Sequence, residues 1–295
     1  MDYRKCQLCC RECGVDRTAG ELGFCGATDK MTVARAALHM WEEPVISGER
    51  GSGTVFFSGC SLGCVFCQNK DISTSRVIGK ELSADALSSV MLSLERQGAH
   101  NINFVTPTHF APSIKAAVNL AREKGLSVPI VYNTSSYDSV DSLRMLSGTV
   151  DIYLADFKFY MPRTAKLLSS AEDYPLRAKE AILEMVRQIP TPIIEDGIMK
   201  RGVIVRVLLL PSHVAEAKLI VKYLYEAYGD NIYISLMSQY TPIGEQMPPL
   251  DRRVTRAEYY ELVEYAEKLG VDNCFIQERE SAGTAYIPDF DNTGV

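Results

Sequence analysis

The sequence predicts an α/β fold: a partial (βα)6 barrel of the TIM type with a small cysteine-rich N-terminal module. Apolar strand-like runs alternate with segments of helical periodicity, which is the pattern of βα units. Six such units follow one another and favour a parallel barrel or partial barrel. The alternative is an open doubly wound sheet, but the glycine-rich phosphate loop expected after its first strand is absent.

Each expected strand is a short run of aliphatic and aromatic residues, and each expected helix repeats apolar residues every three or four positions. The strands are expected at Thr54–Phe57, Ile102–Thr106, Pro129–Asn133, Ile152–Asp156, Val203–Leu210 and Ile232–Met237. The helices are expected at Ser83–Gln97, Ser113–Lys124, Asp138–Leu146, Pro175–Gln188, His213–Tyr228 and Thr255–Leu269. Ser83 and Thr255 are typical N-caps, and Glu258 completes a capping box with Thr255.

No internal repeat, low-complexity tract or long linker divides the chain. We expect a cysteine-rich metal-binding module over residues 1–45, a barrel core over residues 46–280 and a C-terminal tail over residues 281–295.

Composition excludes several classes of protein. The 295 residues, 46% hydrophobic and 23% charged, suffice for a large buried core. No stretch approaches the ~18 uninterrupted apolar residues of a spanning helix, and the first residues lead into cysteines rather than an apolar leader. A net charge of -6 disfavours nucleic acid as a partner. We therefore expect a cytoplasmic protein without a membrane or nucleic-acid partner, in which nine cysteines bind metal rather than form disulfides.

Cys60, Cys64 and Cys67 are spaced C-x3-C-x2-C on the loop after the first expected strand. Three thiolates on one loop can hold three corners of a [4Fe-4S] cube and leave the fourth iron without a protein ligand. The alternatives are a zinc loop or a redox-sensing thiol cluster. Zinc usually takes four ligands in C-x2-C pairs, and no fourth ligand stands beside this triplet. The spacing therefore indicates an iron–sulfur cluster with one open iron.

The segment from Ser58 to Cys67 closely resembles the motif of the radical SAM superfamily. The resemblance implies that S-adenosylmethionine chelates the open iron and that an electron from the cluster cleaves it to a 5'-deoxyadenosyl radical. It also implies that Phe66, which precedes the last of the three cysteines, packs near the adenine. The alternative for Phe66 is an ordinary place in the core.

Reacting groups of parallel barrels lie after the C-terminal ends of the strands. After the second strand, Thr106 and Thr108 can meet the amino group of the cofactor, where the wider superfamily has Gly-Gly-Glu. After the fourth strand, Asp156 and Lys158 have alternate-residue spacing, which points both to one face. A cation beside a carboxylate suits a zwitterionic ligand, and a surface ion pair is the alternative.

The pair Asn133-Thr134 and the run from Asp156 to Lys158 resemble the third- and fourth-strand signatures of glycyl-radical-enzyme activases. The resemblance implies that these four polar residues contact the carboxylate of the cofactor and a monovalent cation. Activases typically have Asp at the position of Asn133, and the lost charge weakens cation affinity. The resemblance also implies a glycyl radical enzyme as partner and a reductant such as flavodoxin or ferredoxin.

Arg206 is a single charge in the apolar fifth strand, and burying it is costly unless it is paired. It is a catalytic or ion-pair candidate, and an outward-facing solvated Arg is the alternative. Gln239 follows the sixth strand and is a candidate contact to cofactor or substrate. Nearly the whole chain resembles iron–sulfur proteins related to pyruvate formate-lyase activating enzyme, although Val207 stands where that family often has His.

A second cysteine locus comprises Cys6, Cys9, Cys13 and Cys25. Four thiolates suit a closed zinc site or an auxiliary iron–sulfur cluster, and free thiols are the alternative. The related family often has Pro at the position of Cys10, which suggests that Cys10 is the spare thiol. The choice between Cys9 and Cys10 stays open.

His109 follows the second-strand turn, at the rim where a substrate is expected to enter. It can position a substrate or donate a proton, and a capping or core role is the alternative. His39 and His100 are expected to be structural, and His213 is expected at a helix N-terminus.

Taken together, these features predict a radical SAM enzyme in which the adenosyl radical abstracts hydrogen. The hydrogen comes from a glycine of a partner enzyme if the activase resemblance extends to substrate, and otherwise from another protein or a small metabolite. A non-enzymatic iron–sulfur electron carrier and a zinc-stabilised binding protein remain as alternatives.

Overall fold

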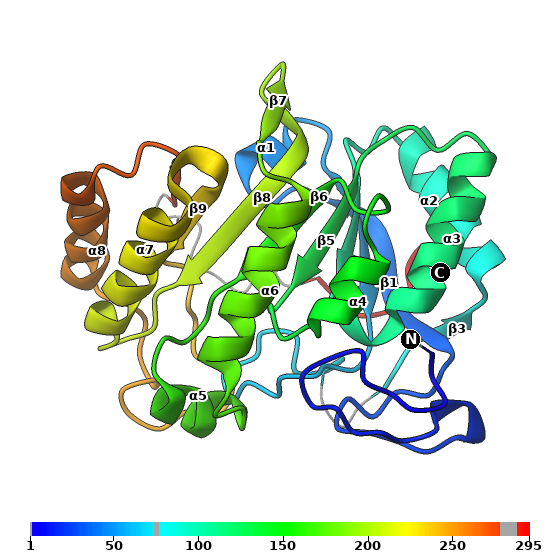
Figure 1. Cartoon of the computed structure of the whole chain (residues 1–295), viewed down its shortest axis with the longest axis horizontal. Coiled ribbons are helices and arrows are strands. Elements are labelled where there is room, and N and C mark those ends of the chain that lie inside the picture. The colour runs from blue at the N-terminus through cyan, green and yellow to red at the C-terminus, as the bar shows by residue number, and fades with distance from the viewer. Residues whose placement is uncertain (1, 74–76, 278–287) are drawn as a thin grey trace.

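One sheet organises the fold (Figure 1), a computed structural model that describes residues 2–73, 77–277 and 288–295. The strands are β1 (Met31–His39), β2 (Ser52–Phe57), β3 (Lys80–Leu82), β4 (Ile102–Val105), β5 (Ile130–Thr134), β6 (Ile152–Asp156), β7 (Ile193–Glu195), β8 (Ile198–Leu208), β9 (Tyr233–Met237) and β10 (Cys274–Ile276). The helices are α1 (Pro44–Ser47), α2 (Ala84–Arg96), α3 (Ala111–Glu123), α4 (Val140–Met145), α5 (Pro162–Ser169), α6 (Tyr174–Gln188), α7 (Val214–Tyr228) and α8 (Arg256–Leu269).

The strand order is β10-β9-β8-β6-β5-β4-β2-β1-β3. From β2 to β10 every neighbouring pair along this path is parallel, whereas β1 is antiparallel to both β2 and β3. The two ends of the path, β10 and β3, do not pair with each other in the described part of the chain. The predicted α/β partial barrel is thus confirmed, and its sheet is open.

All six predicted strands and all six predicted helices are present, with ends that differ by a few residues. The caps at Ser83 and Thr255 form as predicted, and the Thr255–Glu258 capping box is complete. The sequence prediction missed β1, β3, β7, β10, α1 and α5. Apart from β1 these elements have three to eight residues, too few for a periodic pattern to stand out.

Residues 1–45 were expected to form a module apart from the barrel. The structure places β1, which lies within this range, in the main sheet against β2. The module boundary stays a prediction, but the sheet begins before it. Within the expected tail, residues 281–287 lie outside the described residues, as do residues 278–280 at the end of the expected core.

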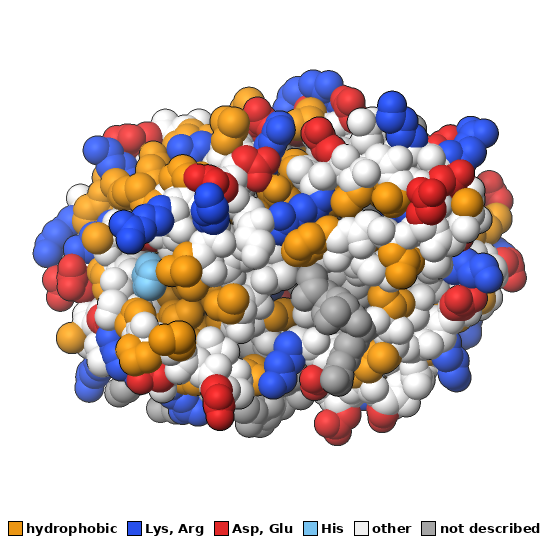
Figure 2. Space-filling model, turned by 90° about the horizontal axis from the view of Figure 1, so that it is seen from below, with side chains coloured by type: hydrophobic (Ala, Val, Ile, Leu, Met, Phe, Trp, Pro, Cys, Tyr) orange, Lys and Arg blue, Asp and Glu red, His pale blue; other side chains and the backbone are white. Residues whose placement is uncertain are grey.

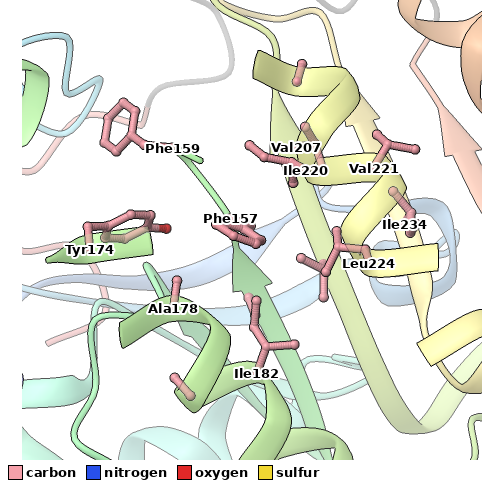
Figure 3. Close-up of a cluster of buried hydrophobic side chains, with 14 of the residues drawn as sticks. Phe157, Phe159, Tyr174, Ala178, Ile182, Val207, Ile220, Val221, Leu224 and Ile234 are labelled. Atoms are coloured by element: carbon pink, nitrogen blue, oxygen red, sulfur yellow. The ribbon is translucent and has the colours of Figure 1, made fainter. Parts of the chain in front are cut away.

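Helices α4, α6 and α7 lie in front of the sheet in Figure 1, α8 lies at its left side, α2 and α3 lie at its right side, and α1 lies behind it. Figure 3 shows part of the largest core cluster, where side chains of α6 and α7 meet those of β8 and β9 around Phe157. A smaller cluster packs Val45 and Ile46 of α1 against Val131, Ile152 and Ile204. The short α1 therefore fills part of the inner face of the open barrel.

Across the described ranges, no helix combines the length and apolar character needed to cross a lipid bilayer.

Candidate functional site

A pocket opens where the parallel strands end. In Figure 1 these carboxyl ends point downward, and Figure 2 looks onto that face. The pocket brings together most of the predicted site residues: Cys60, Cys64, Phe66, Cys67, Thr106, Asn133, Thr134, Asp156, Lys158, Arg206 and Gln239. Segments almost 180 residues apart in sequence therefore meet at one site, as expected for the C-terminal face of a parallel barrel.

The three-cysteine loop is a tight turn after β2. Gly59 and Gly63 have φ of 90° and 72°, a region that favours glycine. A Cβ on Gly59 would lie 2.8 Å from the carbonyl oxygen of Cys25, so the N-terminal segment packs directly on this loop. Arg11 strengthens that contact, because its guanidinium donates hydrogen bonds to the carbonyl oxygens of Ser61 and Leu62 at 2.9 and 3.0 Å.

All three cysteines of the loop are partly buried. Burial raises the pKa of Cys64 and of Cys67, and the positive charge of Lys158 opposes that rise for both. The amide of Leu62 donates a hydrogen bond to Cys60 Sγ at 3.4 Å. Coordination deprotonates a thiol outright, so these raised pKa values do not preclude metal binding.

Within the part of the chain that the structure describes, no three His, Cys, Asp or Glu side chains converge as they would around one metal ion. A cluster differs in this respect, because its three thiolates bind three different irons and need not converge on a single point. Three thiols on one loop, lining one pocket beside a cation, fit a site-differentiated [4Fe-4S] cluster.

Asp156, at the end of β6, connects two cations. Its Oδ1 accepts a hydrogen bond from Arg206 Nε at 2.7 Å, and its Oδ2 accepts one from Lys158 Nζ at 2.6 Å. All three side chains are mostly buried. These ion pairs keep the pKa of Asp156 low although burial alone would raise it. The interpretation of Asp156 and Lys158 as a surface pair is therefore wrong, and so is a solvated Arg206.

Glu42 completes this network and was not found from the sequence. Its Oε1 accepts hydrogen bonds from Asn103 Nδ2 at 2.9 Å and Asn133 Nδ2 at 3.2 Å, and its Oε2 lies 3.3 Å from Arg206 Nη1. The carboxylate lines the pocket. An acidic residue in an irregular segment carries no periodic signal, so only the fold reveals it.

The oxygens predicted to bind a monovalent cation are already engaged. Arg206 Nη2 donates to Asn133 Oδ1 at 2.6 Å, and Arg206 Nε takes Asp156 Oδ1. A guanidinium of the protein itself therefore lies between these two oxygens. The monovalent cation stays a prediction that this arrangement disfavours.

Aromatic residues form another wall of the pocket. Phe66 packs edge-on against Phe159 and Tyr240, with ring centroids 6.1 Å apart in both pairs. Gln239 lies beside them, and its Oε1 accepts a hydrogen bond from Gln277 Nε2 at 3.0 Å. Flat apolar surface next to a polar strand end suits a purine ring.

Thr106 has a φ of 57°, a left-handed conformation that costs energy for a β-branched residue. It also lines the pocket, so strained backbone coincides with the candidate site. The hydroxyl of Thr134 donates a hydrogen bond to the buried carboxyl of Asp138, which fixes the Thr134 side chain. Asp138 also accepts a hydrogen bond from Tyr132 Oη at 2.9 Å.

The expected positions of His109 and Thr108 need correction. His109 is 1% exposed and does not line the pocket, so it is not at the rim. Its Nε2 bonds the carbonyl oxygen of Ser58 at 2.8 Å, and burial lowers its pKa to about 3, which keeps it neutral. Thr108 is buried as well, and its hydroxyl lies 3.5 Å from that of Thr134. His109 and Thr108 therefore contact the segments that form the pocket but do not line the pocket themselves.

His39 and Trp41, by contrast, line the pocket. His39 was expected to be structural, and Trp41 was not singled out. His39 is the last residue of β1, and Trp41 comes shortly after this strand. Because the sequence prediction missed β1, it could not place either residue in the site.

Burial raises the pKa of Cys9, and the nearby thiols of Cys6, Cys13 and Cys25 raise it further, so the four N-terminal cysteines interact electrostatically. Cys10 points elsewhere, with its Sγ 3.2 Å from the carbonyl oxygen of Asp138. This separation favours Cys9 over Cys10 as the member of the group. A metal bound to these four thiols stays a prediction.

Comparison with known proteins now bears on the site. Residues 54–199 match the model of the Radical SAM superfamily, a range that includes the three cysteines, Asn133, Asp156 and Lys158. The chain contains a radical SAM domain. A radical SAM domain implies a [4Fe-4S] cluster and S-adenosylmethionine, in agreement with the thiols and paired charges of the pocket.

The radical SAM domain has relatives of two kinds. An uncharacterized protein of Methanocaldococcus jannaschii is 29% identical over 280 residues, covering 92% of this chain and 76% of the relative. Streptococcus suis SuiB bound to S-adenosylmethionine has a TM-score of 0.51 at 13% identity, covering 74% of this chain and 48% of SuiB. SuiB bound to precursor peptide SuiA gives 0.51 at 12% identity, covering 74% and 46%. The chain spans about half of SuiB, and this likeness shows the fold alone.

Proposed function

We propose that this radical SAM enzyme abstracts a hydrogen atom from a polypeptide partner. The observation that carries the radical chemistry is one pocket that holds three loop thiols beside the Asp156–Lys158–Arg206 ion pairs. When bound, the cluster and S-adenosylmethionine supply one electron and a sulfonium, which together yield methionine and a 5'-deoxyadenosyl radical. The residues of the pocket would hold this group so that its 5' carbon could accept a hydrogen atom from the substrate, with 5'-deoxyadenosine as the product.

The residues of the chain bind and orient the cofactor. Lys158 and Arg206 receive its carboxylate, and Asp156 keeps both cations in place. Thr106 meets its amino group from the end of β4, and Thr134 at the end of β5 contacts its carboxylate. Phe66 packs near its adenine. The buried position of this network excludes water, which strengthens each charge interaction.

The choice of a polypeptide rests on the surface around the pocket. Hydrophobic side chains gather on the left half of the face in Figure 2. Val65, beside the cluster cysteines, is 54% exposed, and Leu167 and Met247 are 74% and 82% exposed. Val65 lies close to the segments that carry Leu167 and Met247. Its amide donates a hydrogen bond to the carbonyl oxygen of Leu168, and its own carbonyl oxygen accepts one from the side chain of Gln246.

Exposed apolar patches of this kind mark protein interaction sites. The resemblance to glycyl-radical-enzyme activases points to a backbone glycine as the hydrogen donor, with flavodoxin or ferredoxin as reductant. A small-metabolite substrate would need no apolar surface outside the pocket.

The deciding experiment is anaerobic reconstitution with iron and sulfide, followed by S-adenosylmethionine and dithionite, with 5'-deoxyadenosine measured by chromatography. We expect product from the wild type and from Cys274→Ala, a cysteine remote from the pocket, and none from Cys64→Ala. An intact cluster in the wild type without product or a cofactor-induced spectral change would instead support an electron carrier.

A further inference from the structure

Glu42 lies outside the segment that matches the superfamily, between β1 and α1. Its carboxylate nevertheless reaches the centre of the cofactor pocket and contacts Asn103, Asn133 and Arg206. Glu42, Asn133 and Arg206 form a closed ring of hydrogen bonds, because Asn133 donates to Glu42 and accepts from Arg206. Each member of such a ring restricts the others.

Each of the three guanidinium nitrogens of Arg206 donates a hydrogen bond to a side-chain oxygen from a different segment. Nε bonds Asp156 of β6, Nη2 bonds Asn133 of β5, and Nη1 bonds Glu42. These contacts use three of the five N–H donors of a guanidinium. The two that remain, one on each Nη, can serve a ligand in the pocket that Arg206 lines.

The backbone of Glu42 is fixed as firmly as its side chain. Its amide donates to Ser47 Oγ at 3.0 Å, which ties it to α1. Helix α1 is in turn anchored by Ile46, which is fully buried against residues of β5, β6 and β8. The position of the carboxylate is therefore set by the inner face of the barrel.

We propose that Glu42 is a positioning residue that orients Arg206 toward the carboxylate of the cofactor. This inference rests on the proposed function, because it assumes that S-adenosylmethionine occupies the pocket. Without Glu42, Asp156 would be the acid that remains hydrogen-bonded to Arg206. The guanidinium would turn toward both carboxylate oxygens of Asp156 and displace Lys158 from Oδ2, which weakens both cations as ligands for the cofactor.

The test is equilibrium dialysis of labelled S-adenosylmethionine against the reconstituted protein without reductant, so that binding is measured apart from turnover. We expect Glu42→Gln to weaken binding about 10- to 100-fold, the range typical for residues that orient a ligand-binding group. Glu49→Gln is the matched control, because Glu49 is an exposed acid just after α1 that does not line the pocket, so the same change there should leave binding unchanged.

A double-mutant cycle with Arg206→Met separates positioning from a merely structural role. If Glu42 acts through Arg206, Glu42→Gln causes no further loss of binding in the Arg206→Met background. It should also raise the melting temperature of Arg206→Met, because it removes a buried charge left without its partner.

Equal binding by Glu42→Gln and wild type would overturn the inference, as would full additivity of the two losses. Failure of the wild type itself to bind S-adenosylmethionine would instead refute the proposed function.

Discussion

At the scale of single residues, the pocket is a balance of buried charges. Hydrogen bonds or ion pairs join the carboxyls of Glu42 and Asp156 to the cations Lys158 and Arg206, and burial raises the pKa of Glu42. Glu43 is the additional acid. Its Oε2 is buried without a hydrogen-bond partner among the described residues, and burial raises its pKa to about 7. Ionising this buried carboxyl therefore opposes folding.

We therefore predict that Glu43→Gln stabilises the protein at alkaline but not at acidic pH. Because its pKa is raised in the folded state, the folded chain binds this proton more tightly than the unfolded chain. Wild-type stability then falls as pH rises from about 4.5 to 7, whereas glutamine does not titrate. Melting temperatures at pH 5 and pH 8 check this. A difference between variant and wild type that is the same at both pH values would contradict it.

At the scale of elements, the connection from β1 through α1 to β2 is the part of the fold that shapes the site. Helix α1 has only four residues and starts with Pro44, which is suited to a first helical turn. Gly48 ends it where a Cβ would lie 2.4 Å from Ile198 Cδ1, so the turn passes close to β8. This short segment carries Glu42 to the inner face of the sheet.

Ile46→Ala should therefore affect both stability and cofactor binding. Truncating a fully buried isoleucine costs about 2–5 kcal/mol of unfolding free energy, and Ile46 anchors the helix to which the backbone of Glu42 is hydrogen-bonded. Ile182→Ala is the control, because Ile182 is equally buried but lies in the outer core between α6 and the sheet. Denaturant unfolding should show similar losses for both. Only Ile46→Ala should weaken binding of S-adenosylmethionine, and equal binding by the two variants would argue against this role of α1.

At the scale of the whole molecule, the N-terminal segment contributes a strand to the sheet, and the C-terminal residues pack on that strand. β1 pairs with β2, and the last residues pack along β1, where Asn292 and Thr293 exchange backbone hydrogen bonds with Ala34 and Ala36. Arg35 also forms an ion pair with Asp291 at 2.9 Å. The barrel core is thus covered at its first parallel strand by segments that flank it in sequence.

A chain that begins at residue 46 should consequently fail to fold cooperatively. It lacks β1, which leaves the edge of β2 unpaired and removes the surface on which the C-terminal residues pack. It also lacks Glu42, the partner of Arg206. Thermal unfolding followed by circular dichroism, with the full chain in parallel, checks this. A native spectrum with one sharp transition would show that residues 1–45 are an independent module.

The sequence by itself determined the parallel βα order, the cysteine loop and the polar residues at the strand ends. These features are local: a strand is a short apolar run, a helix has its period, and C-x3-C-x2-C places three thiols on one turn. Because parallel strands end at one edge, Asn133, Asp156 and Arg206 could be predicted to meet.

Only the tertiary structure decided which residues flank those strand ends. Glu42, His39 and Trp41 enter the pocket through β1 and α1, elements that form because of their contacts with β2 and the inner face of the sheet. His109 was misplaced for the same reason: it follows a strand, yet the N-terminal segment covers it, and Arg17 bonds its carbonyl oxygen at 2.6 Å. Contacts between residues distant in sequence leave no periodic signal, so they emerge only when the chain has folded.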